Sequence, residues 1–241
     1  MKLIAVNSYD ELSQQAADIM ESQIRQKPNS VLGLATGSTP LGCYQELIRR
    51  HQSEGLDFSQ ITSFNLDEYY NLSPDNPNSY RYYMNHFFFD HININKEATH
   101  VPNGMPKDMM AECREYDELS IHMGGTDIQI LGLGVTGHIA FNEPDLVFHP
   151  ETRLVNLNDS TLQANGHYFK KEGFMPDKAV TVGMRFIFNS RLILLLASSD
   201  KKADALERTI NGPITPMVPA SILQIHPNVI IIADKAALSK L

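Results

Sequence analysis

The sequence has few of the features that link a chain to an oxidising compartment or to a nucleic acid. It contains only two cysteines, Cys43 and Cys113, among 241 residues. That is too few for a disulfide framework and typical of a reducing compartment, so we expect buried or bystander thiols. Basic residues are the minority, since 20 Lys and Arg against 28 Asp and Glu give a net charge of −8. Such a surface repels phosphate backbones, which argues against a nucleic-acid partner.

Long hydrophobic runs are also missing. The longest extends from Leu192 to Ala197, whereas a membrane span needs about 20 apolar residues. The N-terminal segment from Met1 to Val6 turns polar at Asn7, so it lacks the apolar core of a signal peptide. We therefore expect a cytoplasmic protein with no membrane partner.

What is present is sufficient for a large core. Hydrophobic residues make up 42% of the chain and charged residues 20%, a balance that excludes a disordered or fibrous protein. At about 150 residues per domain, the length alone predicts between one and two domains. We find no internal repeat, no low-complexity tract and no linker rich in Pro, Gly or Ser.

Short apolar strands alternate with amphipathic helices along the chain. Ser8 and Glu11 form a capping box that begins a helix extending to about Lys27. Pro40 suits the first turn of a second helix, with Thr39 as its N-cap. Further helices are predicted at 78–90, 106–123 and 200–210, and strands at 31–35, 61–66, 127–131, 179–182, 192–197 and 229–233.

This alternation is typical of an α/β fold with a doubly wound, mostly parallel sheet and helices on both faces. We predict a single α/β catalytic domain over residues 1–241. The segment 144–176 is the least regular and the most polar, and we expect it to act as a lid within that domain.

Ligands bind at the carboxyl ends of the strands in such sheets, and three loops there are rich in polar groups. The first, Thr36-Gly37-Ser38-Thr39, follows a strand and begins a helix. Glycine allows a close approach of the backbone, and a helix N-terminus offers free N–H groups, so the loop suits a phosphate. It lacks the Gly-Lys-Ser/Thr of a P-loop and the Gly-x-Ser-x-Gly of a nucleophile elbow. Taken alone, an ordinary capped turn explains it as well.

The second loop places two carboxylates side by side at a strand end, Asp67 and Glu68. Adjacent residues of a strand point to opposite faces, so we expect only one of them to face a ligand. A carboxylate whose pKa is raised by burial can serve as a general base. A solvated acidic turn is the alternative.

The third loop begins with Gly132-Leu-Gly-Val-Thr136-Gly137, which matches the Gly-x-Gly-x-x-Gly of dinucleotide-binding proteins. Pro144 would break the long helix which that motif requires, so we disfavour a nucleotide. The loop instead presents His138 and, five residues later, Glu143. A histidine beside a carboxylate is an oriented acid or base. A metal site would need a third ligand, and the sequence offers no obvious one.

In combination these loops are far more specific than each is alone. The segments Leu34 to Pro40, Asn65 to Tyr69, Gly137 to Pro144 and Pro219 to Gln224 resemble glucosamine-6-phosphate deaminases, and the likeness covers essentially the whole chain. The Thr-Gly-Ser of the first loop is shared with a wider superfamily that includes 6-phosphogluconolactonases. The His-Ile-Ala-Phe-Asn-Glu of the third loop is closer to the deaminases alone.

The resemblance implies conversion of glucosamine 6-phosphate and water to fructose 6-phosphate and ammonia without a cofactor. By position, Asp67 resembles the base that moves the C2 proton to C1, and His138 resembles the ring-opening catalyst, oriented by Glu143. The phosphate ligands that the resemblance implies are Thr36, Gly37, Ser38 and Thr39, with Lys202 as charge partner and Lys201 as the competing candidate.

Two positions depart from the family pattern. Thr136 stands where family members usually carry Asp or Asn, and His167 replaces an Arg of the lid. His167 cannot bind a phosphate in a bidentate way, so we expect weaker substrate binding that improves as the pH falls towards 6. These changes leave open a paralogue for another amino-sugar phosphate or a catalytically weak phosphosugar-binding protein. A lactonase-like hydrolase is a further alternative, and it would not need the C2 base.

The resemblance also bears on assembly. Longer members of the family are allosterically activated hexamers with a C-terminal extension, whereas this sequence stops at Leu241, soon after its last predicted strand. The likeness to the short members implies activity without an activator and favours a monomer.

Overall fold

Seven parallel strands form the central sheet in the computed structural model, which describes residues 1–158, 169 and 176–241. In spatial order they are β1 (Lys2–Val6), β10 (Val229–Asp234), β9 (Ile193–Ala197), β6 (Ile128–Gly132), β2 (Val31–Leu34), β3 (Thr62–Asn65) and β5 (Thr99–His100). All their pairings are parallel. The predicted α/β fold with a mostly parallel sheet is confirmed.

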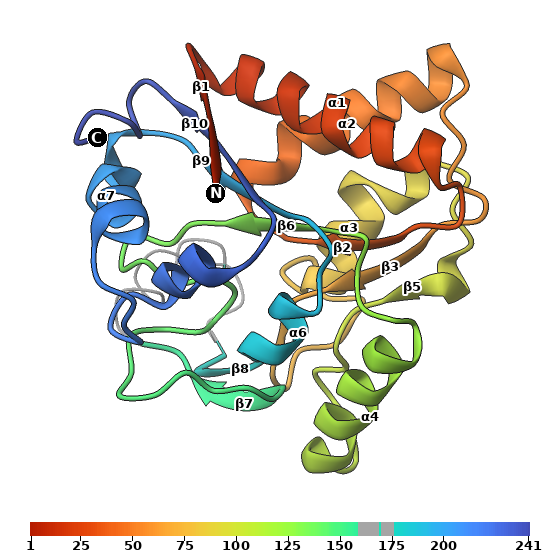
Figure 1. The fold of residues 1–241 in the computed structure, drawn as a ribbon. Coiled ribbons are helices and arrows are strands. Elements are labelled where there is room, and N and C mark those ends of the chain that lie inside the picture. Colours follow the sequence, from red (N-terminus) through yellow and green to blue (C-terminus); the bar gives the residue numbers. More distant parts are fainter. Residues whose placement is uncertain (159–168, 170–175) are drawn as a thin grey trace.

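Helices cover both faces of this sheet (Figure 1). Their bounds are α1 Tyr9–Gln26, α2 Ser38–Glu54, α3 Tyr80–Phe87, α4 Met109–His122, α6 Met184–Phe188 and α7 Ala203–Asn211. Short 3₁₀ turns are η1 Phe89–His91, η2 Lys96–Ala98, η3 Asp200–Lys202 and η4 Pro219–Ile225. Helices α1 and α2 lie together on one face, and α6 lies on the other, where Phe186 packs against Phe64 of β3.

A second sheet has three antiparallel strands in the order β4 (Asp67–Tyr69), β8 (Lys178–Thr181) and β7 (Arg153–Asn156). The strand predicted at 179–182 is therefore present, but it belongs to this sheet and not to the parallel one. Strand β7 lies in a segment that we predicted to be irregular, because its half-exposed residues give no apolar run. Since residues 159–168 and 170–175 are outside the described part, the lid at 144–176 stays a prediction.

The start of α2 differs from the sequence prediction. Its N-cap is Gly37 and its first residue is Ser38, so the assignment of Thr39 as N-cap is wrong. Gly37 has φ +98°, a backbone conformation that glycine adopts without strain, and the helix therefore begins earlier than a side-chain cap would place it. Pro40 still falls in the first turn, where its missing N–H costs no helical hydrogen bond.

Other boundaries moved by a few residues. The helix predicted at 106–123 begins at Met109, because the side chain of Asp108 accepts hydrogen bonds from the N–H groups of Met110 and Ala111. The helices predicted at 78–90 and 200–210 each divide into an α-helix and a 3₁₀ turn. The capping box of α1 is present, since Ser8 Oγ accepts from Glu11 N at 3.2 Å.

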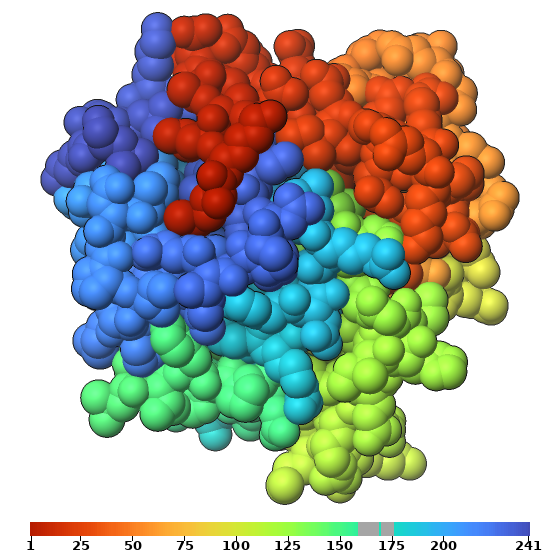
Figure 2. All heavy atoms as spheres, in the orientation of Figure 1, coloured from red at the N-terminus to blue at the C-terminus, as the bar shows by residue number. Residues whose placement is uncertain are grey.

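Strand β1 was not predicted. It pairs with β10 from Lys2↔Ile230 to Val6↔Asp234, so residues from the two ends of the chain lie side by side, as Figure 2 shows in red and blue. Four of its five residues are not buried although Leu3 to Val6 are apolar, as is common for an edge strand, which one neighbour alone covers.

Both cysteines are buried and free, as we predicted. Burial raises the pKa of the Cys43 thiol to about 12, which makes it unreactive at neutral pH. No helix in the described part of the chain is long and apolar enough to cross a membrane.

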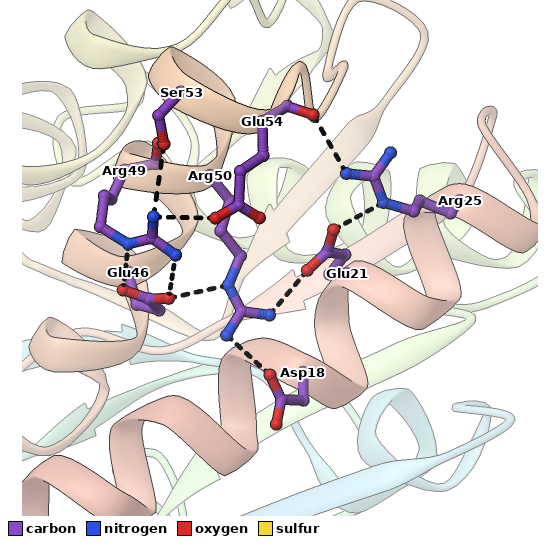
Figure 3. A network of polar contacts seen from close by, with 8 residues as sticks. All are labelled: Asp18, Glu21, Arg25, Glu46, Arg49, Arg50, Ser53 and Glu54. Carbon is purple, nitrogen blue, oxygen red and sulfur yellow. Dashed lines mark hydrogen bonds and ion pairs between the residues drawn. The ribbon is translucent and has the colours of Figure 1, made fainter.

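An ion-pair network joins α1 to α2 (Figure 3). Arg50, only 7% exposed, extends from α2 and bonds to Asp18 at 2.6 Å, Glu21 at 2.7 Å and Glu46 at 2.9 Å. The guanidinium has its donors occupied by three carboxylates, which offsets the cost of burying its charge. The network fixes the helix whose N-terminus carries the first polar loop.

Replacing Arg50 by Ala is expected to lower the free energy of unfolding by about 2 kcal/mol, because it removes a buried side chain together with its charge-assisted hydrogen bonds to carboxylates of both helices. Arg49→Ala is the matched control, since its side chain is 53% exposed and such pairs contribute about 1 kcal/mol or less. Urea unfolding of both variants measures the difference. Equal losses of stability in the two variants would show that the buried Arg50 network stabilises the fold no more than the exposed Arg49 pairs do.

Candidate active site

Four neighbouring strands bring the predicted site residues to one edge of the sheet. Strands β9, β6, β2 and β3 are consecutive and parallel, so the loops that follow them leave from the same side, here called the carboxyl edge. The chain winds outward in one direction from β2 and in the other from β6. Ligands of open α/β sheets bind at such a switch point. Neighbouring strands lie roughly 4.8 Å apart, so the four loops are within reach of one small molecule.

The loop after β2 has the geometry of an anion cradle. Gly37 and Ser38 are exposed, and the space in which a Cβ of Gly37 would lie is open. Glycine is therefore needed for its positive φ and not for lack of room. Ser38 and Thr39 begin α2, where N–H groups have no intrahelical partner and the helix dipole favours negative charge.

Three tyrosine hydroxyls hold this loop from three different helices. Tyr83 donates to the carbonyl of Gly37 at 2.7 Å, Tyr9 donates to that of Ser38 at 2.7 Å, and Tyr44 donates to that of Ala35 at 2.6 Å. With these carbonyls engaged, the peptide groups of the loop are fixed in orientation. Sequence reasoning missed these residues, because no local pattern links three separate helices to one turn.

The two adjacent carboxylates have different roles in the structure. Glu68 accepts hydrogen bonds from the backbone N–H groups of Tyr69 at 2.9 Å, Tyr80 at 2.8 Å and Arg81 at 2.9 Å, and so caps the start of α3. Asp67 is 7% exposed, and its side chain has no hydrogen bond or ion pair to the described residues. Of the two, Asp67 is the carboxyl group that is free to meet a ligand.

Burial sets the protonation of this pair. It raises the pKa of Asp67 to about 8, with a further contribution from the charge of Glu68. Burial also raises the pKa of Glu68 to about 7, although its three backbone hydrogen bonds oppose the shift. An acid with a pKa near the working pH is suited to take up and return a proton.

His138, Glu143 and Thr136 form a compact triangle in the loop after β6. His138 Nδ1 lies 2.8 Å from Glu143 Oε2, and Thr136 Oγ1 lies 2.9 Å from Nδ1 and 3.0 Å from the same carboxylate oxygen. Because the carboxylate can only accept, both Nδ1–H and the threonine hydroxyl donate to it. The neutral ring then carries its proton on Nδ1, which leaves Nε2 as the acceptor.

A glycine makes room for this ring. A Cβ on Gly134 would lie 2.2–2.3 Å from atoms of the His138 imidazole, so any larger residue would displace it. Asn142 closes the turn by donating to the carbonyls of Ile139 at 3.1 Å and Val182 at 2.9 Å. The glycines of this segment therefore serve a tight turn and a packed histidine.

The structure separates the two candidate lysines of the 3₁₀ turn after β9. Lys201 is exposed, whereas Lys202 is partly buried. Burial lowers the pKa of Lys202, and the charge of Lys201 adds to the effect. Within the described residues, Lys202 has no carboxylate partner, which makes it the better candidate for a bound anion.

The segments that follow the four strands at the carboxyl edge thus contain Thr36 to Thr39, Asp67 at the start of β4, Thr136 to Glu143, and Lys202 in η3. The remaining predicted residue, His167, lies outside the described residues. No group of three or more metal-ligating side chains occurs in the parts that are described. Site roles for all these residues are proposals that we develop below.

A parallel sheet with a helix N-terminus, a buried carboxyl group and a histidine–carboxylate pair at its switch point is typical of an α/β enzyme with a small-molecule substrate. The family model for glucosamine-6-phosphate isomerases/6-phosphogluconolactonase matches residues 5–231. The chain belongs to this family, and the resemblance noted in the sequence is confirmed.

Individual relatives agree with this assignment. The chain is 49% identical to a glucosamine-6-phosphate deaminase of Clostridium botulinum, strain Hall, over 100% of its length and 99% of the relative. It is 51% identical to the deaminase of Thermoanaerobacter pseudethanolicus over 99% of the chain and 94% of the relative.

Solved structures give the same picture. A monomeric glucosamine-6-phosphate deaminase superposes with a TM-score of 0.97 at 48% identity, with full coverage of both chains. A 6-phosphogluconolactonase of Thermotoga maritima superposes with a TM-score of 0.76 at 20% identity, covering 97% of this chain and 99% of its own. The second likeness concerns the fold alone.

Proposed function

We propose that the protein is an enzyme that converts glucosamine 6-phosphate and water to fructose 6-phosphate and ammonia. The observation that carries this proposal is the buried Asp67 carboxyl group. It has no partner among the described residues, and it follows β3 at the same carboxyl edge as the phosphate cradle. Lactone hydrolysis has no step that needs a base at C2. The full-length identity to relatives named as deaminases supports the same choice.

The reaction begins with binding and ring opening. Backbone N–H groups of Ser38 and Thr39 at the start of α2 bind the substrate phosphate, and the ammonium of Lys202 balances its charge. The Nε2 atom of His138 takes the proton of the C1 hydroxyl, and a proton is delivered to the ring oxygen as the C1–O5 bond breaks. Glu143 stabilises the imidazolium through the 2.8 Å contact to Nδ1.

Proton transfer follows in the open-chain aldehyde. The ionised Asp67 carboxylate removes the proton from C2, and the electron pair moves through C1 to the aldehyde oxygen, which is protonated to give an enol amine. Asp67 returns its proton to C1, and C2 becomes an iminium carbon. Water adds there, and ammonia leaves as the C2 carbonyl forms, so the products balance the substrate and one water.

We also propose how the chain is organised. Residues 1–241 form one α/β catalytic domain in which the segment 144–176 acts as a lid, and the lid residue His167 contacts the phosphate. The protein acts as a monomer in the cytoplasm and needs no cofactor. The solved relative described as monomeric supports the oligomeric state, and the two free cysteines support a reducing compartment.

Ammonia release from glucosamine 6-phosphate is the direct test. We expect release together with exchange of the C2 proton for solvent deuterium, since Asp67 passes that proton through an exchangeable carboxyl group. Parallel assays with the C4 epimer and with 6-phosphogluconolactone address the two enzymatic alternatives. Lactone hydrolysis without ammonia release, or substrate binding without turnover, would reject the proposal.

Thr136 is expected to keep part of the role that the resemblance gives to Asp or Asn. Its hydroxyl contacts both members of the His138–Glu143 pair, so removal of the hydroxyl in Thr136→Val leaves the imidazole less firmly oriented. We expect kcat to fall about tenfold with KM unchanged, because the loss of one hydrogen bond to a charged group has roughly that effect. Thr136→Asn is the control that should retain activity. A fully active valine variant would remove Thr136 from the site.

A further inference from the structure

The turn that follows β9 holds a serine in a backbone conformation that is nearly exclusive to glycine. Ser199 has φ +84° and ψ 156°. This region is costly for any residue with a Cβ, and residues forced into it cluster at functional sites. The conformation persists only if surrounding contacts compensate for it, so the contacts of Ser199 indicate what the turn is for.

Asp234 supplies those contacts. Its carboxylate, 7% exposed at the end of β10, accepts from the Ser199 N–H at 3.1 and 3.2 Å and from the Ser198 hydroxyl at 2.5 Å. It also accepts from the N–H of Ala237 at 2.8 Å. Because β10 and β9 are paired neighbours, the carboxylate meets the chain directly where it leaves the sheet.

The strained turn leads directly to the candidate phosphate lysine. The carbonyl of Ser199 accepts from the N–H of Lys202 at 3.1 Å and so sets where the 3₁₀ turn η3 begins. Lys202 is partly buried and has no carboxylate partner in the described ranges. A side chain with that environment is suited to an anion from outside the chain, provided that its backbone is held in place.

We propose that Asp234 is a positioning residue for the substrate phosphate, acting through the strained Ser199 turn on Lys202. The inference rests on the proposed function for the identity of the ligand, but the geometry itself requires only an anion. Asp234 touches no ligand. It holds the serine conformation that directs the start of η3, and thereby the Lys202 ammonium, to the carboxyl edge beside the cradle of α2.

The sign of the effect distinguishes positioning from simple charge. Removal of a negative group near a phosphate site would by itself strengthen anion binding. We expect the opposite for Asp234→Ala, a Kd for inorganic phosphate and a KM for glucosamine 6-phosphate that rise about tenfold, with kcat within about twofold. Asp204→Ala, an exposed carboxylate of α7, changes the net charge equally and should leave both constants unchanged.

Glycine provides the rescue. In Ser199→Gly the turn no longer needs support, so the double variant with Asp234→Ala should recover phosphate affinity to within about twofold of the wild type. Ser199→Gly alone should raise the Tm by a few degrees, because the strain of the positive φ is removed. In a Lys202→Ala background, Asp234→Ala should cause no further loss of phosphate binding, since both act on one contact. If Asp234→Ala does not fold, Asp234→Asn replaces it, with a smaller rise in Kd.

Calorimetric titration with inorganic phosphate keeps this proposal separate from the function. Absence of ammonia release by the wild-type protein would reject the deaminase and leave the phosphate titrations to be judged on their own. Unchanged phosphate affinity in Asp234→Ala would overturn the positioning role. A loss of phosphate affinity that Ser199→Gly does not repair would also overturn it. The same holds for a loss that is equally large in the Lys202→Ala background.

Discussion

Replacing Asp67 by Asn is expected to lower kcat by about 10³-fold or more, because the amide cannot take a proton from C2. The replacement is nearly isosteric, so the fold and the phosphate cradle are retained and KM should change little. Ammonia release measures the loss, and deuterium exchange at C2 should disappear with it. The exposed Asp75→Asn is the matched control. An Asp67→Asn enzyme that still exchanges the C2 proton would exclude Asp67 as the base.

The same variant should be more stable than the wild type in alkaline solution. The folded pKa of Asp67 is about 8, whereas an unfolded aspartate titrates near pH ~3.9. Between these values folding keeps a proton that the unfolded chain releases, so the wild type loses stability by about 1.4 kcal/mol per pH unit. The loss is complete above the folded pKa and absent below the unfolded one.

Urea unfolding across that range tests the linkage. The amide of the Asp67→Asn variant does not titrate, so its stability advantage should be several kcal/mol at about pH 8 and should vanish near pH ~4. A gap that is constant with pH would contradict the raised pKa. For the wild type, kcat/KM should also rise as the pH approaches 8, since only the ionised carboxylate of the free enzyme acts as a base.

Replacing His138 by Gln is the second substitution with a large expected effect. The amide of glutamine cannot accept the C1 hydroxyl proton and release it to the ring oxygen, so ring opening loses its catalyst. We expect kcat to fall about 10²-fold, with the remaining turnover supplied by sugar that opens spontaneously in solution. The exposed His122→Gln at the end of α4 is the matched control.

The dependence on enzyme concentration identifies the step that is lost. If His138 opens the ring, the rate with the Gln variant should reach a plateau as enzyme is added, because spontaneous opening in solution becomes limiting. The wild-type rate should stay proportional to enzyme concentration. A Gln variant whose rate remains proportional would assign His138 to another step of the reaction.

Much of the fold could be predicted from local sequence because its elements are strongly marked. Strand β9 is apolar along its whole length because both of its faces are covered, and α1 begins at a capping box. Strand β1 was missed although Leu3 to Val6 are apolar, because the run is short and its partner β10 lies at the other end of the chain.

The candidate site was predicted as loops and motifs, and its arrangement was not. The sequence could not say which of the Asp67 and Glu68 side chains has no partner among the described residues, because that depends on Glu68 accepting hydrogen bonds at the N-terminus of α3. Nor could it assign a role to Ser199 or Asp234. Their contact requires two strands to be paired in register, about 35 residues apart in the chain.

The expectations about compartment and partners rest on the sequence alone, on its sparse cysteines, acidic balance and short apolar runs. Its motifs determined the family and the residue types at the carboxyl edge. Only the tertiary structure decided which of the two carboxyl groups is buried without a partner among the described residues, which lysine is half-buried, and which contacts support a strained turn. Burial, pKa and the distance between side chains depend on neighbours that are remote in the sequence, and these are defined only when the sheet is assembled.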